Sequence, residues 1–113
     1  TPLYSSAASD VYKRQTLKLF KTEAEWESHI KKLAEGLGWL YYHTWRSDHS
    51  TRGFPDCAMV RSPRIIFAEL KTDSKRSKPS PSQLQWLSQL SDCPVESYLW
   101  RPSDIEEVIK TLK

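Results

Sequence analysis

The chain has 113 residues, of which 38% are apolar and 27% are charged. This length allows one domain with a modest core, and the composition is that of an ordinary soluble protein. The formal net charge of +3 permits an anionic partner without requiring one. No apolar run is long enough to cross a membrane and no signal peptide is visible, so we expect a cytoplasmic protein without a membrane partner.

Residues 1–15 form a stretch of small polar residues with little periodicity, which is typical of a tail. Within it, residues 9–15 (SDVYKRQ) resemble translated sequencing-adapter DNA. We therefore expect residues 1–15 to be non-native or disordered, and residues 16–113 to form the domain. The alternative is that residues 16–20 (TLKLF) are a genuine first strand.

The first helix is expected to start after Thr22, its N-cap, with Glu25 completing a capping box three residues later. Gly36 and Gly38 are expected to end it. Residues 39–45 (WLYYHTW) are aromatic and β-prone, which indicates a strand. The apolar residues of the helix recur at helical spacing, and they are Trp26, Ile30, Leu33 and Leu37.

A β-hairpin is predicted next, because residues 56–61 (DCAMVR) and 64–71 (RIIFAELK) are β-rich and flank Ser62 and Pro63. A turn at this position pairs residues whose numbers sum to about 125. This register places the first residue of the hairpin, Asp56, opposite a residue near the end of the second strand.

The second helix follows residues 72–80 (TDSKRSKPS), a basic polar loop. Ser80 is its expected N-cap, Pro81 takes the first helical position and Gln83 completes a capping box. The apolar stripe of this helix consists of Leu84, Leu87 and Leu90, with Trp86 beside it.

Residues 94–100 (PVESYLW) alternate in polarity and predict a fourth strand, parallel to the third through a right-handed helical crossover. Ser103 and Glu106 are expected to cap a last helix. The predicted order is α-β-β-β-α-β-α, an α/β fold with a mixed central sheet flanked by helices. The expected inward residues of the last helix are Ile105, Val108, Ile109 and Leu112.

The cysteines and tryptophans bear on the core. Cys57 and Cys93 show no metal-ligand spacing and lie in or beside predicted strands, which favours two reduced, buried thiols. Most of the five tryptophans are expected in the core, because a tryptophan buries a large area. Trp45 differs, because it lies in a polar stretch and could face a ligand.

The hairpin brings three charges together. Its register sets Asp56 opposite Glu69, and Lys71 projects from the same face of the strand as Glu69. Two facing carboxylates repel unless they are neutralised, and a divalent cation such as Mg²⁺ or Mn²⁺ suits hard oxygen ligands. The backbone carbonyl of Leu70 could add a ligand, and Lys71 could orient a water or stabilise charge at phosphorus.

The pattern therefore predicts hydrolysis of a phosphodiester by a metal-activated water. The alternative is a structural cluster of cross-strand charges on a solvated face. Against that alternative, the flanking residues of the second strand are apolar, as in a core: Ile65, Ile66, Phe67 and Leu70.

GFPD followed by FAELK is the P-D…(D/E)-x-K signature of restriction-endonuclease-like nucleases. With GWLYYHTWRSDHSTRGFPD, FAELKTD, SPSQLQWL and YLWRPSD, the chain from Thr22 onwards resembles a virus-type replication-repair nuclease (VRR-NUC) domain. The resemblance implies a restriction-endonuclease-like core in which Asp56 and Glu69 bind metal and Lys71 is catalytic. It further implies that Glu23 contacts the metal or its waters.

The resemblance also assigns Gln83, which matches the glutamine that opens the helix after the catalytic strand. Glu23 has an alternative role as a first-turn acid that favours the helix dipole, and Gln83 has one as a capping residue. Glu27 departs from the family pattern, because relatives often carry Gln there. This leaves open which carboxylate of the first helix, Glu23 or Glu27, faces the metal.

Basic and polar residues near the cluster are predicted to bind the DNA backbone, because guanidinium groups make bidentate contacts with phosphate. The alternative for the basic run after the catalytic strand is a solvated loop. No set of residues is suited to reading base edges, which favours recognition of shape or branching. The predicted DNA-binding residues are Arg46, Ser47, Arg52, Lys75, Arg76 and Lys78.

Together these features predict a Mg²⁺- or Mn²⁺-dependent DNA endonuclease that acts on Holliday junctions or other branched DNA in phage or bacterial replication and repair. Stand-alone domains of the family resemble dimeric junction resolvases, which implies a homodimer. The alternatives are a monomeric flap or nicking nuclease, a catalytically silent DNA-binding module of the same fold, and a protein-interaction domain.

Overall fold

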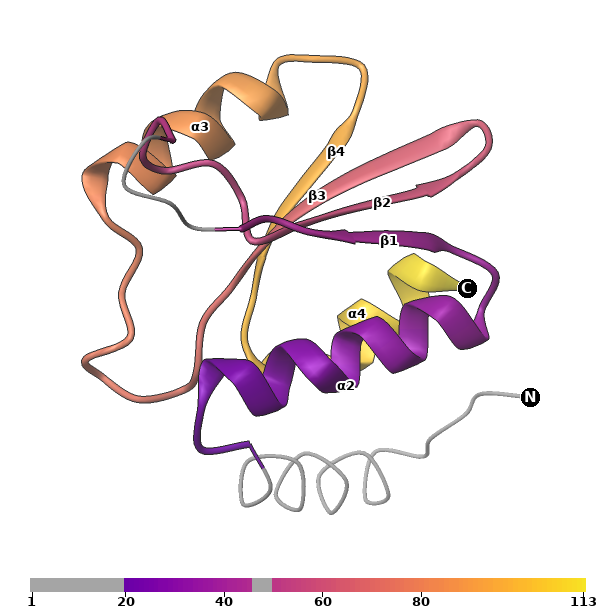
Figure 1. Cartoon of the computed structure of the whole chain (residues 1–113), viewed down its shortest axis with the longest axis horizontal. Coiled ribbons are helices and arrows are strands. Elements are labelled where there is room, and N and C mark those ends of the chain that lie inside the picture. Colours follow the sequence, from indigo (N-terminus) through magenta and orange to yellow (C-terminus); the bar gives the residue numbers. More distant parts are fainter. Residues whose placement is uncertain (1–19, 46–49) are drawn as a thin grey trace.

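The computed structural model describes residues 20–45 and 50–113 (Figure 1). The elements follow the order predicted from the sequence, with a short 3-10 turn before the last helix. Three predictions fall outside the described residues. They are the N-terminal tail, its alternative of a first strand at residues 16–20 (of which only Phe20 is described), and the DNA contacts of Arg46 and Ser47. The elements are α2 (Glu23–Gly36), β1 (Leu40–His43), β2 (Cys57–Arg61), β3 (Arg64–Leu70), α3 (Pro81–Ser91), β4 (Glu96–Trp100), η1 (Pro102–Asp104) and α4 (Ile105–Leu112).

The four strands form one sheet in the order β1-β2-β3-β4, in which β3 and β4 are parallel and the other pairs are antiparallel. This confirms the predicted mixed sheet. In β2 and β3, Cys57 pairs with Ala68 and Arg61 pairs with Arg64, and in both pairs the residue numbers sum to 125. The predicted register is therefore correct. The pair Cys57–Ala68 is followed, one residue further along each strand, by Asp56 and Glu69.

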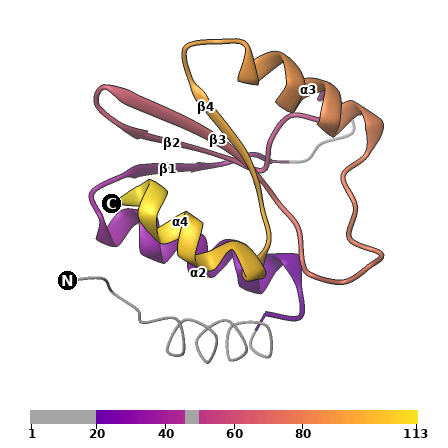
Figure 2. The same ribbon diagram turned by 180° about the vertical axis from the view of Figure 1, so that it is seen from behind.

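The helices cover the two sides of the sheet unequally. Helices α2 and α4 lie together on one face, and α3 lies on the opposite side (Figures 1 and 2). The hydrophobic core fills the space between the sheet and the α2–α4 layer, and α3 has no fully buried residue. The core residues are Trp26, Ile30, Ala34, Trp39, Cys57, Met59, Ile66, Ala68, Leu70, Trp100, Ile105, Val108, Ile109 and Leu112.

Local interactions set the ends of α2. The Thr22 hydroxyl accepts a hydrogen bond from the Glu25 N–H at 3.1 Å, which confirms the predicted N-cap. At the other end, the Arg61 side chain donates hydrogen bonds to the carbonyls of Leu37 and Leu112 at 2.8 and 3.0 Å. These bonds satisfy carbonyl groups that the ends of α2 and α4 leave open, and they tie both helices to the hairpin.

Two predictions about single residues are wrong. Cys57 is buried, and burial raises the pKa of its thiol to about 12, but Cys93 is exposed, because it follows α3, a helix with no fully buried residue. Ser103 is not the N-cap of α4. It lies within η1, and its hydroxyl donates to the carboxylate of Asp73 at 2.6 Å.

Within residues 20–45 and 50–113, no helix is both long and apolar enough to cross a membrane.

Candidate active site

The end of β3 brings two charged side chains into the interior. Glu69 is 1% exposed and Lys71 is 7% exposed, and the Lys71 N–H donates to the Trp100 carbonyl at 3.1 Å. The Lys71 Nζ lies 3.6 Å from Glu69 Oε1 and 3.5 Å from Glu23 Oε1. Burial of charged groups carries a large desolvation cost, so this arrangement is not explained by stability alone.

Asp56 lies just before β2 and links both neighbouring strands. Its Oδ2 accepts a hydrogen bond from the Leu70 N–H at 2.8 Å, and its backbone carbonyl accepts one from the Thr44 N–H at 2.9 Å. The Asp56 carboxylate is therefore held beside the Glu69–Leu70 peptide, as the register predicted. That Asp56 and Glu69 share one cation stays a prediction.

A cavity of about 310 Å³ adjoins Asp56 and collects acidic groups from α2. Glu27 Oε2 lies 2.6 Å from His43 Nδ1 and accepts a hydrogen bond from the Tyr41 hydroxyl at 3.0 Å. Glu27 is thus held by β1, whereas Glu23 is the α2 carboxylate that reaches Lys71. The residues lining this acidic cavity are Glu23, Ala24, Glu27, His43, Thr44, Trp45, Asp56 and Leu70.

Gln83 connects α3 to the buried carboxylate. Its Oε1 accepts from the Ser80 N–H at 2.8 Å, and its Nε2 donates to Glu69 Oε1 at 2.6 Å. The Ser80 hydroxyl accepts in turn from the Gln83 N–H at 3.2 Å, which completes the predicted capping box. The two ends of one amide therefore cap a helix and bind Glu69, which confirms the capping alternative, whereas the role that the resemblance gives Gln83 in the site stays a prediction.

The glycine of the GFPD motif is required by a close contact. Gly53 has a φ of +95°, and a Cβ at this position would lie 2.5 Å from the Ser82 carbonyl oxygen. The Trp86 indole N–H donates to the Arg52 carbonyl at 3.1 Å, and the ring of Phe54 packs edge-on against Trp86 with centroids 5.1 Å apart. These contacts clamp the loop before Asp56 onto the first turns of α3.

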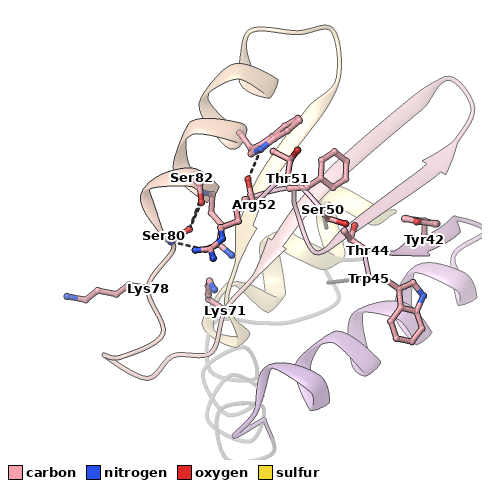
Figure 3. Close-up of a pocket in the computed structure, with 14 residues that line it drawn as sticks. Tyr42, Thr44, Trp45, Ser50, Thr51, Arg52, Lys71, Lys78, Ser80 and Ser82 are labelled. Atoms are coloured by element: carbon pink, nitrogen blue, oxygen red, sulfur yellow. Dashed lines mark hydrogen bonds between the residues drawn. The ribbon is translucent and has the colours of Figure 1, made fainter. Parts of the chain in front are cut away.

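A second, larger cavity of about 1060 Å³ opens between this loop and α3 (Figure 3). It carries three cationic side chains, Arg52, Lys71 and Lys78, among hydroxyl and aromatic groups. We refer to it as the cationic cavity. Its other lining residues are Tyr42, Thr44, Trp45, Ser50, Thr51, Gly53, Phe54, Ser80, Ser82, Gln83 and Trp86.

The loop that carries the predicted DNA contacts Lys75, Arg76 and Lys78 is held from outside its own sequence. The Arg101 side chain donates hydrogen bonds to the carbonyls of Thr72 and Ser77. All three cationic residues are exposed on this loop. Sequence reasoning gave no role to Arg101, which lies within the YLWRPSD motif but 24 to 29 residues from its partners.

A divalent cation such as Mg²⁺ needs hard oxygen ligands, and the groups near Asp56 offer several. Among the side chains of residues 20–45 and 50–113, no group of three or more His, Cys, Asp or Glu is arranged as a metal site. Mg²⁺, however, commonly takes only one or two carboxylates, and it completes its shell with waters and phosphate oxygens. Asp56, Glu69 and the carbonyl of Leu70 could form such a sparse set of hard oxygen ligands.

The four-stranded mixed sheet and its flanking helices form a mixed α/β domain in which β3, α2 and α3 converge on Glu69 and Lys71. A solved structure described as a VRR_NUC domain is similar to this chain, with a TM-score of 0.63 and 22% sequence identity. The match covers 78% of this chain and 94% of that one, and it confirms the predicted VRR-NUC resemblance at the level of the fold. No family model and no curated protein matches the chain.

Proposed function

We propose that this protein is a Mg²⁺- or Mn²⁺-dependent DNA endonuclease. The observation that carries the proposal is the burial of Glu69 and Lys71 together at the end of β3, with Asp56 hydrogen-bonded to the next backbone amide. Burial of charged side chains lowers the stability of a small domain, and such buried charges are typical of catalytic sites. The similar fold of a VRR_NUC domain supports the same activity.

The metal ligands in this proposal are Asp56, Glu69 and the backbone carbonyl of Leu70, with Glu23 acting through a water. When bound, the cation would polarise the phosphate and lower the pKa of an attacking water. The protein holds the ligands in place in advance: the Leu70 N–H binds Asp56, and the Gln83 amide binds Glu69. These outer contacts restrict the orientation of both carboxylates.

Lys71 is proposed as the catalytic cation. Its ammonium nitrogen lies 3.5 Å from Glu23 Oε1 and 3.6 Å from Glu69 Oε1, so two carboxylates orient it. From this place it would orient the nucleophilic water and stabilise the negative charge that develops on the phosphate. Such a group acts strongly because it is withdrawn from bulk water, where charges are screened.

The DNA backbone would lie over the cationic cavity and the neighbouring basic loop. Arg52 lines the cavity, and Lys75, Arg76 and Lys78 are exposed on the loop that follows β3. Arg46 and Ser47, which the sequence also singles out, fall in the part of the chain that is not described. Binding through phosphates predicts an affinity that falls steeply with salt.

The proposed substrate is branched DNA, such as a Holliday junction, processed by a homodimer during phage or bacterial replication and repair. What supports this choice is the resemblance to VRR-NUC domains and the absence of a sequence motif for base-edge recognition. A symmetric dimer would carry two active sites, which could cut two DNA strands at symmetric positions.

The experiment is to incubate the purified protein with Mn²⁺ and with synthetic four-way junction, flap and linear duplex DNA. The wild type is compared with Asp56→Ala, which removes one proposed ligand, and with Asp92→Ala, a carboxylate at the far end of α3. Paired symmetric nicks that only Asp56→Ala abolishes would support the proposal. Cleavage of flaps alone would favour a monomeric flap nuclease, and salt-dependent binding without cleavage would favour a silent DNA-binding module.

A further inference from the structure

Trp45 is unlike the core tryptophans of this protein. Its side chain is 77% exposed, whereas Trp26, Trp39 and Trp100 are 3% exposed or less. Tryptophan is highly buried on average, because burial removes the large apolar surface of its ring system from water. A tryptophan this exposed, placed at the mouth of a charged cavity, has a surface that a ligand could cover.

The position of Trp45 is shared by both cavities. Thr44 and Trp45 line the acidic cavity, which holds Asp56, and also the cationic cavity, which holds Lys71. In the view of Figure 3, Trp45 and Lys78 lie at opposite ends of the lining, with Lys71 between them. A group that covers the indole would therefore lie next to the place where the proposed chemistry occurs.

The indole ring is supported from one side by a fixed neighbour. The ring of His43 meets it edge-on at a centroid distance of 5.6 Å and an interplanar angle of 72°. His43 is itself held by Glu27, whose Oε2 lies 2.6 Å from its Nδ1. A supported aromatic ring loses less freedom on binding than a mobile one, so it is suited to stacking.

The cationic cavity supplies the second half of a nucleotide site. Arg52, Lys71 and Lys78 carry positive charge, and hydroxyl groups lie between them and Trp45. Cations that follow a phosphate backbone, combined with an aromatic ring that stacks a base, are the usual features of single-strand binding. The cavity volume of about 1060 Å³ leaves ample room for a nucleotide. The lining hydroxyls are those of Thr44, Ser50, Thr51, Ser80 and Ser82.

We propose that Trp45 stacks an unpaired nucleobase next to the scissile phosphate, so that the protein selects DNA with single-stranded nucleotides at the cleavage point. This inference rests on the proposed nuclease function and narrows its substrate class. Bases inside a continuous duplex are stacked on one another and cannot reach an indole without being extruded. Bases at a flap, a single-stranded end or an open branch point are already available.

The test measures binding without cleavage, in EDTA, so that it does not depend on a working active site. The probe is 2-aminopurine placed at the first unpaired position of a flap DNA, whose fluorescence falls when the base stacks. A fully paired duplex of the same length is the reference substrate. The variants are Trp45→Ala, Trp45→Phe and Leu40→Ala. Leu40 is a matched control, because it is 76% exposed on the preceding strand and lines neither cavity.

Trp45→Ala is expected to lose the fluorescence quench and to bind flap DNA roughly 10- to 100-fold more weakly, with duplex affinity unchanged. Trp45→Phe should retain part of the quench, and Leu40→Ala should behave as wild type. Wild-type flap affinity in Trp45→Ala, or an equal loss for flap and duplex, would overturn the inference while leaving the nuclease proposal intact. If the wild type binds no flap DNA in EDTA, this inference fails, and the Mn²⁺ cleavage assay with Asp56→Ala decides the nuclease proposal separately.

Discussion

The β2–β3 hairpin carries charges at both of its ends, and the two ends hold them differently. At the turn, the Arg64 guanidinium donates two hydrogen bonds to the Glu96 carboxylate at 2.7 and 2.6 Å, and about a third of each side chain is exposed. At the other end, Glu69 and Lys71 are almost wholly buried, and their charged atoms lie 3.6 Å apart.

The two pairs differ in how far stability alone explains them. A bidentate pair at the surface keeps part of its hydration and contributes a modest stabilisation. At the buried end, Glu69 accepts a hydrogen bond from Gln83, but Glu69 and Lys71 lose their hydration while their own charged atoms lie 3.6 Å apart, so apolar residues in their place would often be as stable or more so. The catalytic role proposed for Glu69 and Lys71 would explain why these charges are buried. We therefore expect substitutions at the buried end to reduce cleavage, and substitutions at the turn to reduce stability alone.

The largest effect is expected for Glu69→Gln. It removes a proposed metal ligand, so the rate of Mn²⁺-dependent cleavage should fall roughly 10³-fold, as expected when several kcal/mol of stabilisation are lost. The thermal unfolding midpoint should also fall, because the buried Lys71 loses one of its two carboxylate partners. The measurements are the initial rate of cleavage on a fixed DNA substrate and the thermal unfolding midpoint.

The matched change at the turn end is Glu96→Gln, which breaks the ion pair with Arg64. It should leave the cleavage rate unchanged and lower the free energy of unfolding by about 1 kcal/mol. If Glu69→Gln cleaves as fast as Glu96→Gln, the functional reading of the buried end is wrong.

The next largest effect is expected for Gly53→Ala. The new Cβ would collide with the Ser82 carbonyl, and the backbone at +95° is unfavourable for alanine. The loop should therefore shift away from α3 and carry Asp56 with it. A displacement of this kind can reduce the cleavage rate roughly 10²-fold.

Gly36→Ala is the control for that variant, because a Cβ at Gly36 meets nothing within 4 Å and its φ is not positive. It should cleave DNA at the wild-type rate and be at least as stable. Equal rates for both alanine variants would show that the contact between Gly53 and Ser82 does not position the site.

A smaller effect is expected for Gln83→Ala, which removes the hydrogen bond to Glu69 and half of the capping box. The cleavage rate should fall roughly 10-fold, and the free energy of unfolding should fall by about 1 kcal/mol. Gln85→Ala, an exposed position on the same helix, is the control and should change neither quantity. A loss of stability without a loss of rate would mean that Gln83 serves only as a helix cap.

The smallest effect concerns pH and the Arg64–Glu96 pair. The hydrogen bond from Arg64 lowers the pKa of Glu96 below its ordinary value in the folded state. A lowered pKa in the folded state means that the pair stabilises the fold above the pKa of the unfolded chain and loses this contribution as the pH falls through the folded-state pKa. The unfolding midpoints of wild type and Glu96→Gln should therefore differ at pH 7 and converge as the pH falls through the folded-state pKa of Glu96. A constant difference over this range would contradict the assignment.

Interactions within a few residues could be predicted from the sequence. The Thr22 and Ser80 caps are local contacts between a side chain and an amide three residues later. The hairpin register follows from the turn at Ser62 and Pro63 together with the two-residue period of a strand. Both kinds of prediction succeeded because short chain segments allow few alternatives.

Interactions across the fold could not be predicted in the same way. The indole of Trp86 holds Arg52 over a separation of 34 residues, and Arg101 holds the basic loop over 24 to 29 residues. Cys93 was expected to be buried, but it follows α3, which has no fully buried residue, and it is exposed. Such contacts depend on how helices pack on the sheet, and a single sequence carries no local pattern for them.

The sequence determined the order of the elements and the hairpin register that sets Asp56 beside the Glu69–Leu70 peptide. For Glu23 and Gln83 it left two roles open each, and the packing of the helices on the sheet shows what their side chains contact. Glu23 arrives on α2 and Gln83 on α3, from opposite sides of the sheet. The physical reason is that burial of the core residues of α2 and α4, together with the contact of α3 with β4, fixes where each helix N-terminus lies.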